Sequence, residues 1–451
     1  MWLLDSLSFE ESIYVVSLAL FGILTPAIHY FRKEARDFWS PLSILSLIVL
    51  YYMVAGPLLA IQNGESFFRL VDHRPFMIHA WRLCALGVGA MILGYWMNPS
   101  GRSRSETPVV PQSLALRYSS RLILLSLFAL VGLFGTGGLM QQVDILDVSY
   151  TRRTYAGAFQ NYLIHSMDFL IGAACLMLTA VLRKKTSWWF LVVLIVLAAL
   201  IFTKQGFRWR LIVMGIGLFS TYYLSRNSKP SPILFASLTI LGLLVMGFIG
   251  YTRTYGLGLD ITSVEGRTST DFILEGFGES SIFMTTGLLV EQVPSVFSHI
   301  GTDPMVQALA LPVPRVLWPD KPSGEYIQII NSLYGDPSYG MGASILNFGE
   351  YYLAFGYYGV VFISFLLGYI LKGLWKWYMR RKSEDTAIVA YSVGIAFLYV
   401  VLSRGYLPQV TMLFFFTVFP LWLIHRFQEK HNRQYLYLMR LKKRLDVSGA
   451  Q

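Results

Sequence analysis

The chain has 451 residues, of which 55% are hydrophobic and 14% are charged, whereas soluble domains carry about a quarter charged residues. This composition excludes an ordinary soluble enzyme and indicates an integral membrane protein. The formal net charge of +11 would suit nucleic acid, but the basic residues follow the pattern of membrane topology, so no nucleic acid partner is expected.

Eleven apolar runs have roughly the length that a helix needs to cross a hydrocarbon layer about 30 Å thick. We predict membrane-spanning helices at residues 11–31, 41–61, 77–97, 120–139, 161–182, 188–203, 209–225, 232–252, 351–372, 386–402 and 408–425. The expected fold class is therefore an all-α polytopic integral membrane protein with about eleven transmembrane helices and one large outer loop.

The distribution of Lys and Arg predicts the orientation of these helices. With the N-terminus outside, the inner segments hold 24 of the 37 basic residues and 7 of the 26 acidic residues, which gives +17 inside and −6 outside. This satisfies the positive-inside rule. We therefore expect a bundle of about eight spans (1–252), a large outer loop with short helices (253–350), about three further spans (351–425) and a basic inner tail (426–451).

The outer basic residues are exceptions to that rule, and several lie at the outer ends of spans. They come from separate parts of the chain: Arg82, Arg152, Arg153, Lys204, Arg208, Arg210, Arg253 and Arg404. Guanidinium groups gathered at one depth suit a phosphate ligand, because Arg binds phosphate bidentately. Alternatively, each side chain reaches the lipid headgroups or pairs with an outer carboxylate. For the whole set we favour a common anionic ligand.

Two smaller patterns accompany the outer arginines. The tripeptide Tyr-Thr-Arg ends at Arg152 and again at Arg253, which puts these two residues in similar settings. His165 and Asp168 lie three residues apart and so share a face of the fifth span. Ionisable residues inside a membrane are functional candidates, although a hydrogen-bonded packing pair explains these two equally well.

The first half of the outer loop contains an apolar segment at residues 276–296. It is interrupted by Glu279, Glu291 and Pro294, so we expect a helix that lies against the membrane or dips partly into it. Counting it as a span would place the basic tail outside, against the charge distribution.

The second half of the outer loop is rich in proline. A short helix at 304–311 is terminated by the sequence LPVPRVLWPDKP (311–322). Its four prolines predict a rigid extended path. This path would hold a set of polar and aromatic side chains near the interface: Arg315, Trp318, Asp320 and Lys321.

Two stretches carry a resemblance to a known family: PRVLWPDKP (314–322) and GASILNFGEYYLAFGYYG (342–359). Together with the long outer loop before the last three spans, they resemble the bacterial O-antigen and oligosaccharide repeat-unit polymerases of the Wzy type. The match at the level of residues covers 312–359, and the rest of the chain agrees in topology only.

This resemblance implies a multi-pass protein of the bacterial inner membrane, with a periplasmic N-terminus and a cytoplasmic C-terminus. It would transfer a growing glycan from undecaprenyl diphosphate to the non-reducing end of a new lipid-linked repeat unit at the outer face. The implied partners are the undecaprenyl-diphosphate-linked oligosaccharide, the lipid bilayer and a chain-length regulator protein.

The residues suit such a glycosyl transfer without a metal or cofactor. A lipid diphosphate is already a good leaving group, and the chain has neither an Asp-x-Asp pair nor a His/Cys cluster with metal-ligand spacing. Arginines on the diphosphate would stabilise the charge that develops as the glycosidic bond breaks. The candidates for this role are Arg152, Arg208, Arg253, Arg315 and Arg404.

The acceptor hydroxyl needs a general base, for which we favour Glu350, followed by Asp320 and His165. Glu350 could instead cap the ninth span, where a carboxylate is favoured by the helix dipole. Asp320 could simply pair with the neighbouring lysine. Trp318 and Tyr351 are candidates for stacking on sugars, although an interfacial aromatic belt would also explain them.

The sequence leaves other functions open. An O-antigen ligase has a similar architecture but hands its glycan to a lipid core. A transporter or flippase usually shows internal repeats and charges near the membrane midplane, whereas here the charges gather at one edge and the expected number of spans is odd. A structural subunit would leave the outer arginines unexplained. We therefore favour the polymerase.

Overall fold

The computed structural model describes residues 7–99, 114–141, 143–145, 163–253, 258–311, 313, 317–321, 324–335 and 343–448. The described part is almost entirely helical. Its strands are the short β1 (Phe67–Phe68) and β2 (Val71–Asp72), which pair antiparallel. The predicted all-α polytopic class is confirmed.

The helices follow one another in three groups. The first group is α1 (Phe9–Phe31), η1 (Ala35–Trp39), α2 (Pro41–Val49), the π-helix η2 (Leu50–Ala55), α3 (Gly56–Gln62), η3 (Arg74–Phe76), α4 (Met77–Met97), α5 (Ala115–Gln141), η4 (Ser166–Asp168), α7 (Phe169–Leu182), α8 (Trp188–Lys204), α9 (Arg208–Arg226) and α10 (Pro232–Thr252). The second group is η5 (Ile261–Val264), α11 (Ser269–Gly276), η6 (Gly278–Ser280), α12 (Ser281–Gln292), α13 (Asp303–Ala310) and α14 (Glu325–Ser332). The third group is α16 (Asn347–Met379), α17 (Asp385–Ala396), α18 (Leu398–Ser403), α19 (Leu407–Thr417) and α20 (Phe419–Ser448).

Nine helical stretches among the described residues are long and apolar enough to cross a membrane. They are Phe9–Phe31, Pro41–Gln62, Arg74–Met97, Ala115–Gly135, Leu163–Leu182, Pro232–Thr252, Asn347–Met379, Asp385–Ser403 and Leu407–Tyr435. The two other segments predicted to span form α8 and α9. Helix α8 is apolar but has only 17 residues. Helix α9 begins with two arginines within three residues and carries Ser, Thr and Tyr in its second half, which lowers its hydropathy.

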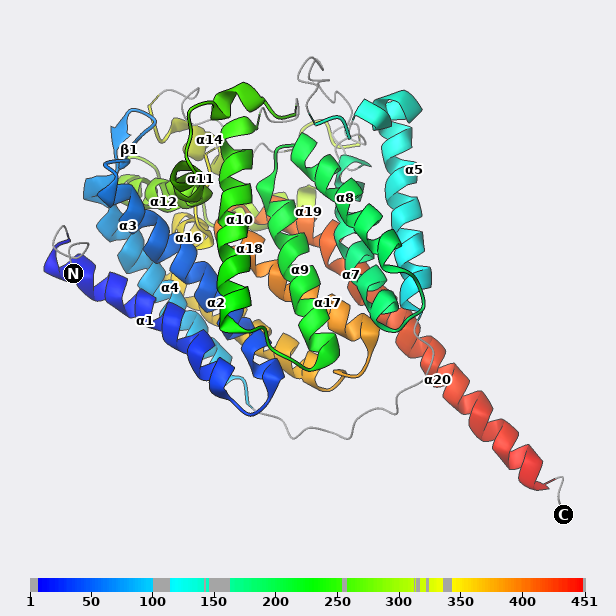
Figure 1. Ribbon diagram of the computed structural model, residues 1–451. Coiled ribbons are helices and arrows are strands. Elements are labelled where there is room, and N and C mark those ends of the chain that lie inside the picture. Colours follow the sequence, from blue (N-terminus) through cyan, green and yellow to red (C-terminus); the bar gives the residue numbers. More distant parts are fainter. Residues whose placement is uncertain are drawn as a thin grey trace.

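The helices alternate in direction, so their ends gather at two opposite ends of the bundle (Figure 1). We call one of them the loop end. It carries β1, β2, α11, α12 and α14 and is uppermost in Figure 1. We call the other the tail end, where η1 lies and where α20 leaves the bundle.

Several spans begin at a serine whose hydroxyl accepts a backbone N–H of the first helical turn: Ser8, Ser40, Ser187 and Ser231. Pro41 and Pro232 follow two of these serines. Proline fits the first helical position, because an N–H there would have no partner within the helix. These local signals explain why the predicted starts of the second and eighth spans lie so close to the observed ones.

Helices α4 and α16 cross at glycines that bring their backbones into contact. An added Cβ at Gly94 would lie 2.0 Å from the carbonyl oxygen of Phe365. One at Gly368 would lie 2.0 Å from the carbonyl oxygen of Met91. Interfaces between membrane helices favour such small residues. Helix α16, which carries Glu350 near its start, is therefore held tightly against α4.

For α12, the expectation that the segment at 276–296 lies against the membrane is wrong, whereas a helix that dips partly into the membrane stays a prediction. Every residue from Ile282 to Val290 is buried within the protein. Gly287 lies so close to η3 that an added Cβ would be 2.4 Å from the carbonyl oxygen of Phe76. The physical reason is that α4 and α16 cover the apolar side chains of α12. With 12 residues, α12 is also too short to cross the membrane, as expected.

Helix α16 is broken near its start, at Gly356. This residue has φ +64° and ψ −157°, a conformation that is almost restricted to glycine. The break frees carbonyl oxygens, and that of Leu353 accepts the N–H of Ile300 at 3.0 Å. The next carbonyl oxygen, of Ala354, accepts the N–H of Gly301 at 3.0 Å. The segment after α12 therefore closes the break in α16.

We expect Gly356→Ala to destabilise the protein by about 1–3 kcal/mol, because alanine is strained in this backbone conformation. Thermal unfolding of the purified protein in detergent would show a lower midpoint. Gly373→Ala is the matched control, since Gly373 lies on the same helix and an added Cβ there meets only Asn98 Nδ2, at 3.9 Å. Equal midpoints for the two variants would contradict the strain.

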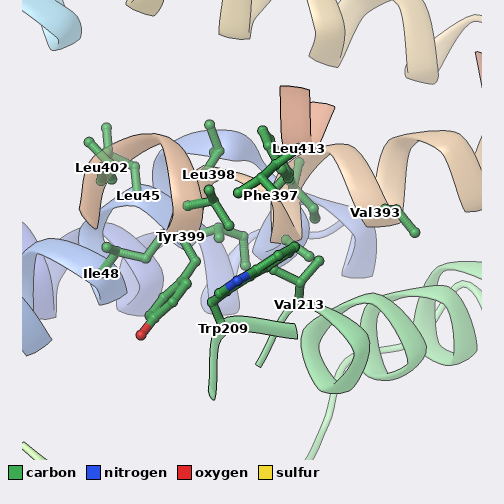
Figure 2. Close-up of a cluster of buried hydrophobic side chains, with 14 of the residues drawn as sticks. Leu45, Ile48, Trp209, Val213, Val393, Phe397, Leu398, Tyr399, Leu402 and Leu413 are labelled. Atoms are coloured by element: carbon green, nitrogen blue, oxygen red, sulfur yellow. The ribbon is translucent and has the colours of Figure 1, made fainter. Parts of the chain in front are cut away.

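The apolar core joins α2, α9, α17, α18 and α19. Figure 2 shows buried side chains from these helices packed together: Leu45, Ile48, Trp209, Val213, Val393, Phe397, Leu398, Tyr399, Leu402 and Leu413. Trp209 is flanked in sequence by Arg208 and Arg210, and the hydroxyl of Tyr399 lies at the edge of the cluster. The core therefore fixes the two helices, α9 and α18, from which polar groups reach the loop end.

Candidate functional site

A buried carboxylate, Glu279 of η6, lies at the centre of a polar cluster near the loop end. Its Oε2 atom accepts hydrogen bonds from the hydroxyls of Tyr52 at 2.7 Å and Tyr399 at 2.9 Å. The two hydroxyl oxygens are themselves 2.6 Å apart. Only 8% of Glu279 is exposed. Three segments far apart in the sequence, η2, η6 and α18, therefore meet at this carboxylate.

The π-helix η2 explains how the second apolar segment supplies this contact. A π turn widens the helix by one residue and is frequent at functional sites. Within η2, the ring of Tyr51 stacks on Phe277 at 5.2 Å, and its hydroxyl donates to the carbonyl oxygen of Gly276. Consecutive residues, Tyr51 and Tyr52, thus both hold the segment around η6.

Arg404 lies in the break between α18 and α19 and faces the same carboxylate. Its Nη2 is 3.9 Å from Glu279 Oε1, and its Nη1 donates to Ser344 Oγ at 3.3 Å. The N–H of Gly405 donates to the carbonyl oxygen of Ile345 at 2.8 Å, so the segment before α16 pairs with the break. The Arg404 side chain is 20% exposed, which makes it accessible at the edge of a largely buried cluster.

The surroundings of Glu279 keep its carboxylate charged. Burial alone would raise the pKa of Glu279. Arg404 and Arg208 act in the opposite direction, and the hydrogen bonds from Tyr52 and Tyr399 add to their effect, so the pKa lies below its ordinary value. The surroundings therefore favour the charged form of the Glu279 carboxylate.

Glu350 lies in the first turn of α16 and is 5% exposed. Its Oε1 accepts the N–H of Leu407 at 2.6 Å. Leu407 is the first residue of α19, and Pro408 after it has no N–H to offer. The sequence suggested that Glu350 could cap its own helix, and the structure shows that it caps α19 instead. Capping of α19 and action as a general base would therefore both use the carboxylate of Glu350.

Helix α14 of the large loop packs over this point. Tyr326 of α14 stacks on Tyr406, with ring centroids 4.6 Å apart and planes 19° from parallel. Burial raises the pKa of Tyr326, and the nearby charge of Glu350 and the Tyr406 hydroxyl raise it further. The break at 404–406, the start of α16 and the large loop are therefore neighbours.

Arg208 is buried and engaged in an ion pair with the partly exposed Glu275. Its Nη2 is 2.7 Å from Glu275 Oε1, and its side chain is 2% exposed. Gly250 makes room for this pair, because an added Cβ there would lie 2.3 Å from both of these atoms. Of the diphosphate candidates in the described residues, Arg208 is therefore held deep in the protein, while Arg404 is accessible.

His165 and Asp168 do come together, as their spacing predicted, and Arg210 joins them. Asp168 is fully buried, its Oδ1 is 2.5 Å from Arg210 Nε, and its Oδ2 is 3.4 Å from His165 Nδ1. The Arg210 guanidinium also lies over the ring of Trp209 at 4.8 Å. Asp168 therefore pairs with Arg210 and His165.

Of the remaining diphosphate candidates, only Arg253 lies within the described residues. Arg253 follows α10, and its backbone pairs with that of Leu259 in an isolated β-bridge. Arg152 and Arg315 fall outside the described residues. Lys204, which belongs to the same outer set, is fully buried and donates to the carbonyl oxygen of Asp144 at 2.9 Å. Arg82 pairs with a carboxylate, that of Glu10, at 2.7 Å.

The Pro-rich run is not extended throughout, so the prediction of an extended path is wrong for its described part. The N–H of Lys321 donates to the carbonyl oxygen of Trp318 at 3.2 Å, which closes a turn with Pro319 at the position that proline favours. Trp318 and Asp320 are exposed there. Tyr351 lies elsewhere, half-buried on α16 with its ring edge-on to that of Phe348.

Sequence reasoning missed the partners that organise this site. Glu279 was visible only as an interruption of an apolar segment, and Tyr52 and Tyr399 as ordinary residues of apolar spans. Glu275 was one of several loop acids. The sequence signal that these residues share is a polar side chain within or beside an apolar segment. This signal identifies the site only when the contacts between the residues are known. Within the described ranges no three His, Cys, Asp or Glu residues lie together in a way that could hold a metal ion.

Comparison with known families gives one result of nearly full length. The family model described as O-antigen polysaccharide polymerase Wzy matches residues 1–432. Comparison with curated proteins and with solved structures gives no match. The matched residues include Glu279, Glu350 and Arg404.

Proposed function

The chain belongs to the family of O-antigen polysaccharide polymerases, and from this premise we propose a specific reaction. The protein transfers a growing glycan from a polyprenyl diphosphate, of the undecaprenyl type, to the non-reducing end of the next lipid-linked repeat unit. The observation that carries this proposal is the family match over residues 1–432. An accessible guanidinium beside a buried carboxylate near the loop end supports it.

The proposed topology places the loop end at the periplasmic face of the inner membrane. The N-terminus is then periplasmic and α20 is cytoplasmic, as the Lys and Arg distribution favours. The bundle of residues 1–252 and the spans of 351–425 together form the membrane part. The loop of 253–350 roofs the site, and a chain-length regulator is a candidate partner.

Donor binding is assigned to arginines. Arg404 is the first candidate, because its side chain is accessible and a planar guanidinium binds phosphate oxygens bidentately. Arg253, Arg152 and Arg315 are further candidates. We place Arg208 behind them, since its guanidinium already bonds to Glu275. These charges would stabilise the diphosphate as it leaves with the electron pair of the glycosidic bond.

The acceptor hydroxyl attacks the donor sugar and loses its proton, and we assign that proton to Glu350. This carboxylate lies close to the break that carries Arg404, so donor and acceptor could meet there. Asp320 is exposed on the large loop and His165 faces Asp168, which makes them second choices. Trp318 and Tyr351 remain candidates for stacking on sugar rings.

A glycan ladder in a polymerase-deficient host tests the function. Wild-type protein should convert a product with a single repeat unit into a ladder of many units. If glycan with one unit were joined to the lipid core only when this protein is present, the protein would be a ligase. If only the leaflet that holds the lipid-linked sugar changed, a transporter would replace the enzyme.

A further inference from the structure

We propose that Glu279 is a positioning residue for Arg404, and that Tyr52 and Tyr399 orient its carboxylate for this task. The inference rests on the proposed function, in which Arg404 binds the lipid diphosphate. It assigns a role to three residues that lie in separate parts of the chain.

The two carboxylate oxygens of Glu279 have different partners. Oε2 accepts both tyrosine hydroxyls, whereas Oε1 faces Arg404 Nη2. Both tyrosines are buried, so they cannot follow the carboxylate if it rotates. The hydroxyls therefore fix the plane of the carboxylate and direct Oε1 at the guanidinium.

The Glu279–Arg404 contact differs from the carboxylate contacts of the buried arginines Arg208 and Arg210. At 3.9 Å it is a charge–charge contact and too long for a hydrogen bond. Arg208 and Arg210 hold their carboxylates at 2.7 Å and 2.5 Å, and both are almost completely buried. Glu279 thus attracts Arg404 without drawing it into the interior. Such an arrangement fits an arginine that has to meet a ligand.

Glu279 is poorly suited to act as the base itself. Its Oε2 is occupied by two hydroxyls, and its neighbours hold its pKa below the ordinary value. A carboxylate with a low pKa accepts a proton less readily. A fixed negative charge behind Arg404, in contrast, organises the guanidinium before the diphosphate arrives, and such preorganisation makes electrostatic stabilisation effective.

The test compares Glu279→Gln, the double variant Tyr52→Phe/Tyr399→Phe and Arg404→Ala in purified protein, with a polyprenyl-diphosphate-linked repeat unit as substrate. Glu279→Gln should raise KM for the donor at least tenfold and also lower kcat, because a less well positioned Arg404 both binds the donor and stabilises the leaving diphosphate less effectively. The tyrosine variant, which keeps the carboxylate charge, should raise KM by a smaller factor. Glu291→Gln is the matched control, because Glu291 is a half-exposed carboxylate twelve residues further on, paired with His79.

A double-variant comparison separates positioning from a purely structural role. If Glu279 acts through Arg404, Glu279→Gln should have no further effect on KM in the Arg404→Ala background. Equal losses in both backgrounds, or an unchanged KM in Glu279→Gln, would overturn the proposal. Thermal unfolding of each variant checks the fold, and the tyrosine variant keeps the proposal testable if Glu279→Gln does not fold.

Binding of the lipid diphosphate without turnover distinguishes failure of the proposed polymerase function from failure of the positioning role of Glu279. If wild-type protein binds polyprenyl diphosphate but does not extend glycan, the proposed function fails. Glu279→Gln should then weaken this binding in otherwise wild-type protein but not in the Arg404→Ala background. That result would still support the positioning role. If wild-type protein neither extends glycan nor binds the diphosphate, both proposals fail.

Discussion

Replacement of Glu350 by glutamine should abolish ladder formation while the protein stays folded. The side-chain oxygen of glutamine can still accept the N–H of Leu407, so the cap on α19 is kept, but an amide cannot take the acceptor proton. A positioned general base contributes roughly 10²–10⁴-fold to rate, and we expect a loss of that size. The measurement is the ladder in a polymerase-deficient host at matched protein levels, followed by turnover of purified protein.

A second substitution separates the cap from the base. Glu350→Ala removes both functions and should in addition lower the unfolding free energy by about 1 kcal/mol, the usual contribution of a helix cap. A ladder that survives Glu350→Gln but weakens in Glu350→Ala would leave Glu350 with the cap alone. The base would then be sought at Asp320 or His165.

Much of this fold could be predicted from sequence, because a hydrocarbon layer makes simple demands. Long apolar runs defined most helices to within a few residues. The exceptions have physical reasons. Helix α12 is apolar because α4 and α16 surround it, and composition alone cannot distinguish burial in protein from burial in lipid. Trp318 and Lys321 join in a turn because a run with several prolines allows both turns and extended paths.

The organisation of the site was much harder to predict. Glu279 meets Tyr399 across 120 positions of sequence and Tyr52 across 227, and no local pattern reports such distances. The π turn that directs Tyr52 toward η6 leaves no trace in an apolar span. The arginines were easier to find, because a charge at the edge of a span is conspicuous. Which of them is accessible depends on how deeply each side chain is packed, and that required the structure.

Replacement of Arg404 by lysine should reduce polymerisation by about 10²-fold, the usual effect of removing one oriented donor from a developing negative charge. Lysine keeps the positive charge beside Glu279, so the buried carboxylate remains compensated. It loses the planar fork that binds two phosphate oxygens at once. The loss should therefore appear in turnover and donor binding, with an unfolding midpoint close to that of wild type.

The contrast with alanine makes the experiment decisive. Arg404→Ala leaves the buried carboxylate of Glu279 without its facing charge and so should destabilise the protein, which makes a weaker ladder in this variant alone ambiguous. Arg82→Lys is the control for a change of arginine to lysine at an exposed pair, that with Glu10, and should retain the ladder. If Arg404→Lys polymerises as well as wild type, a point charge is sufficient at this position. The bidentate contact with the diphosphate would then have to come from another arginine, with Arg253 the first to examine.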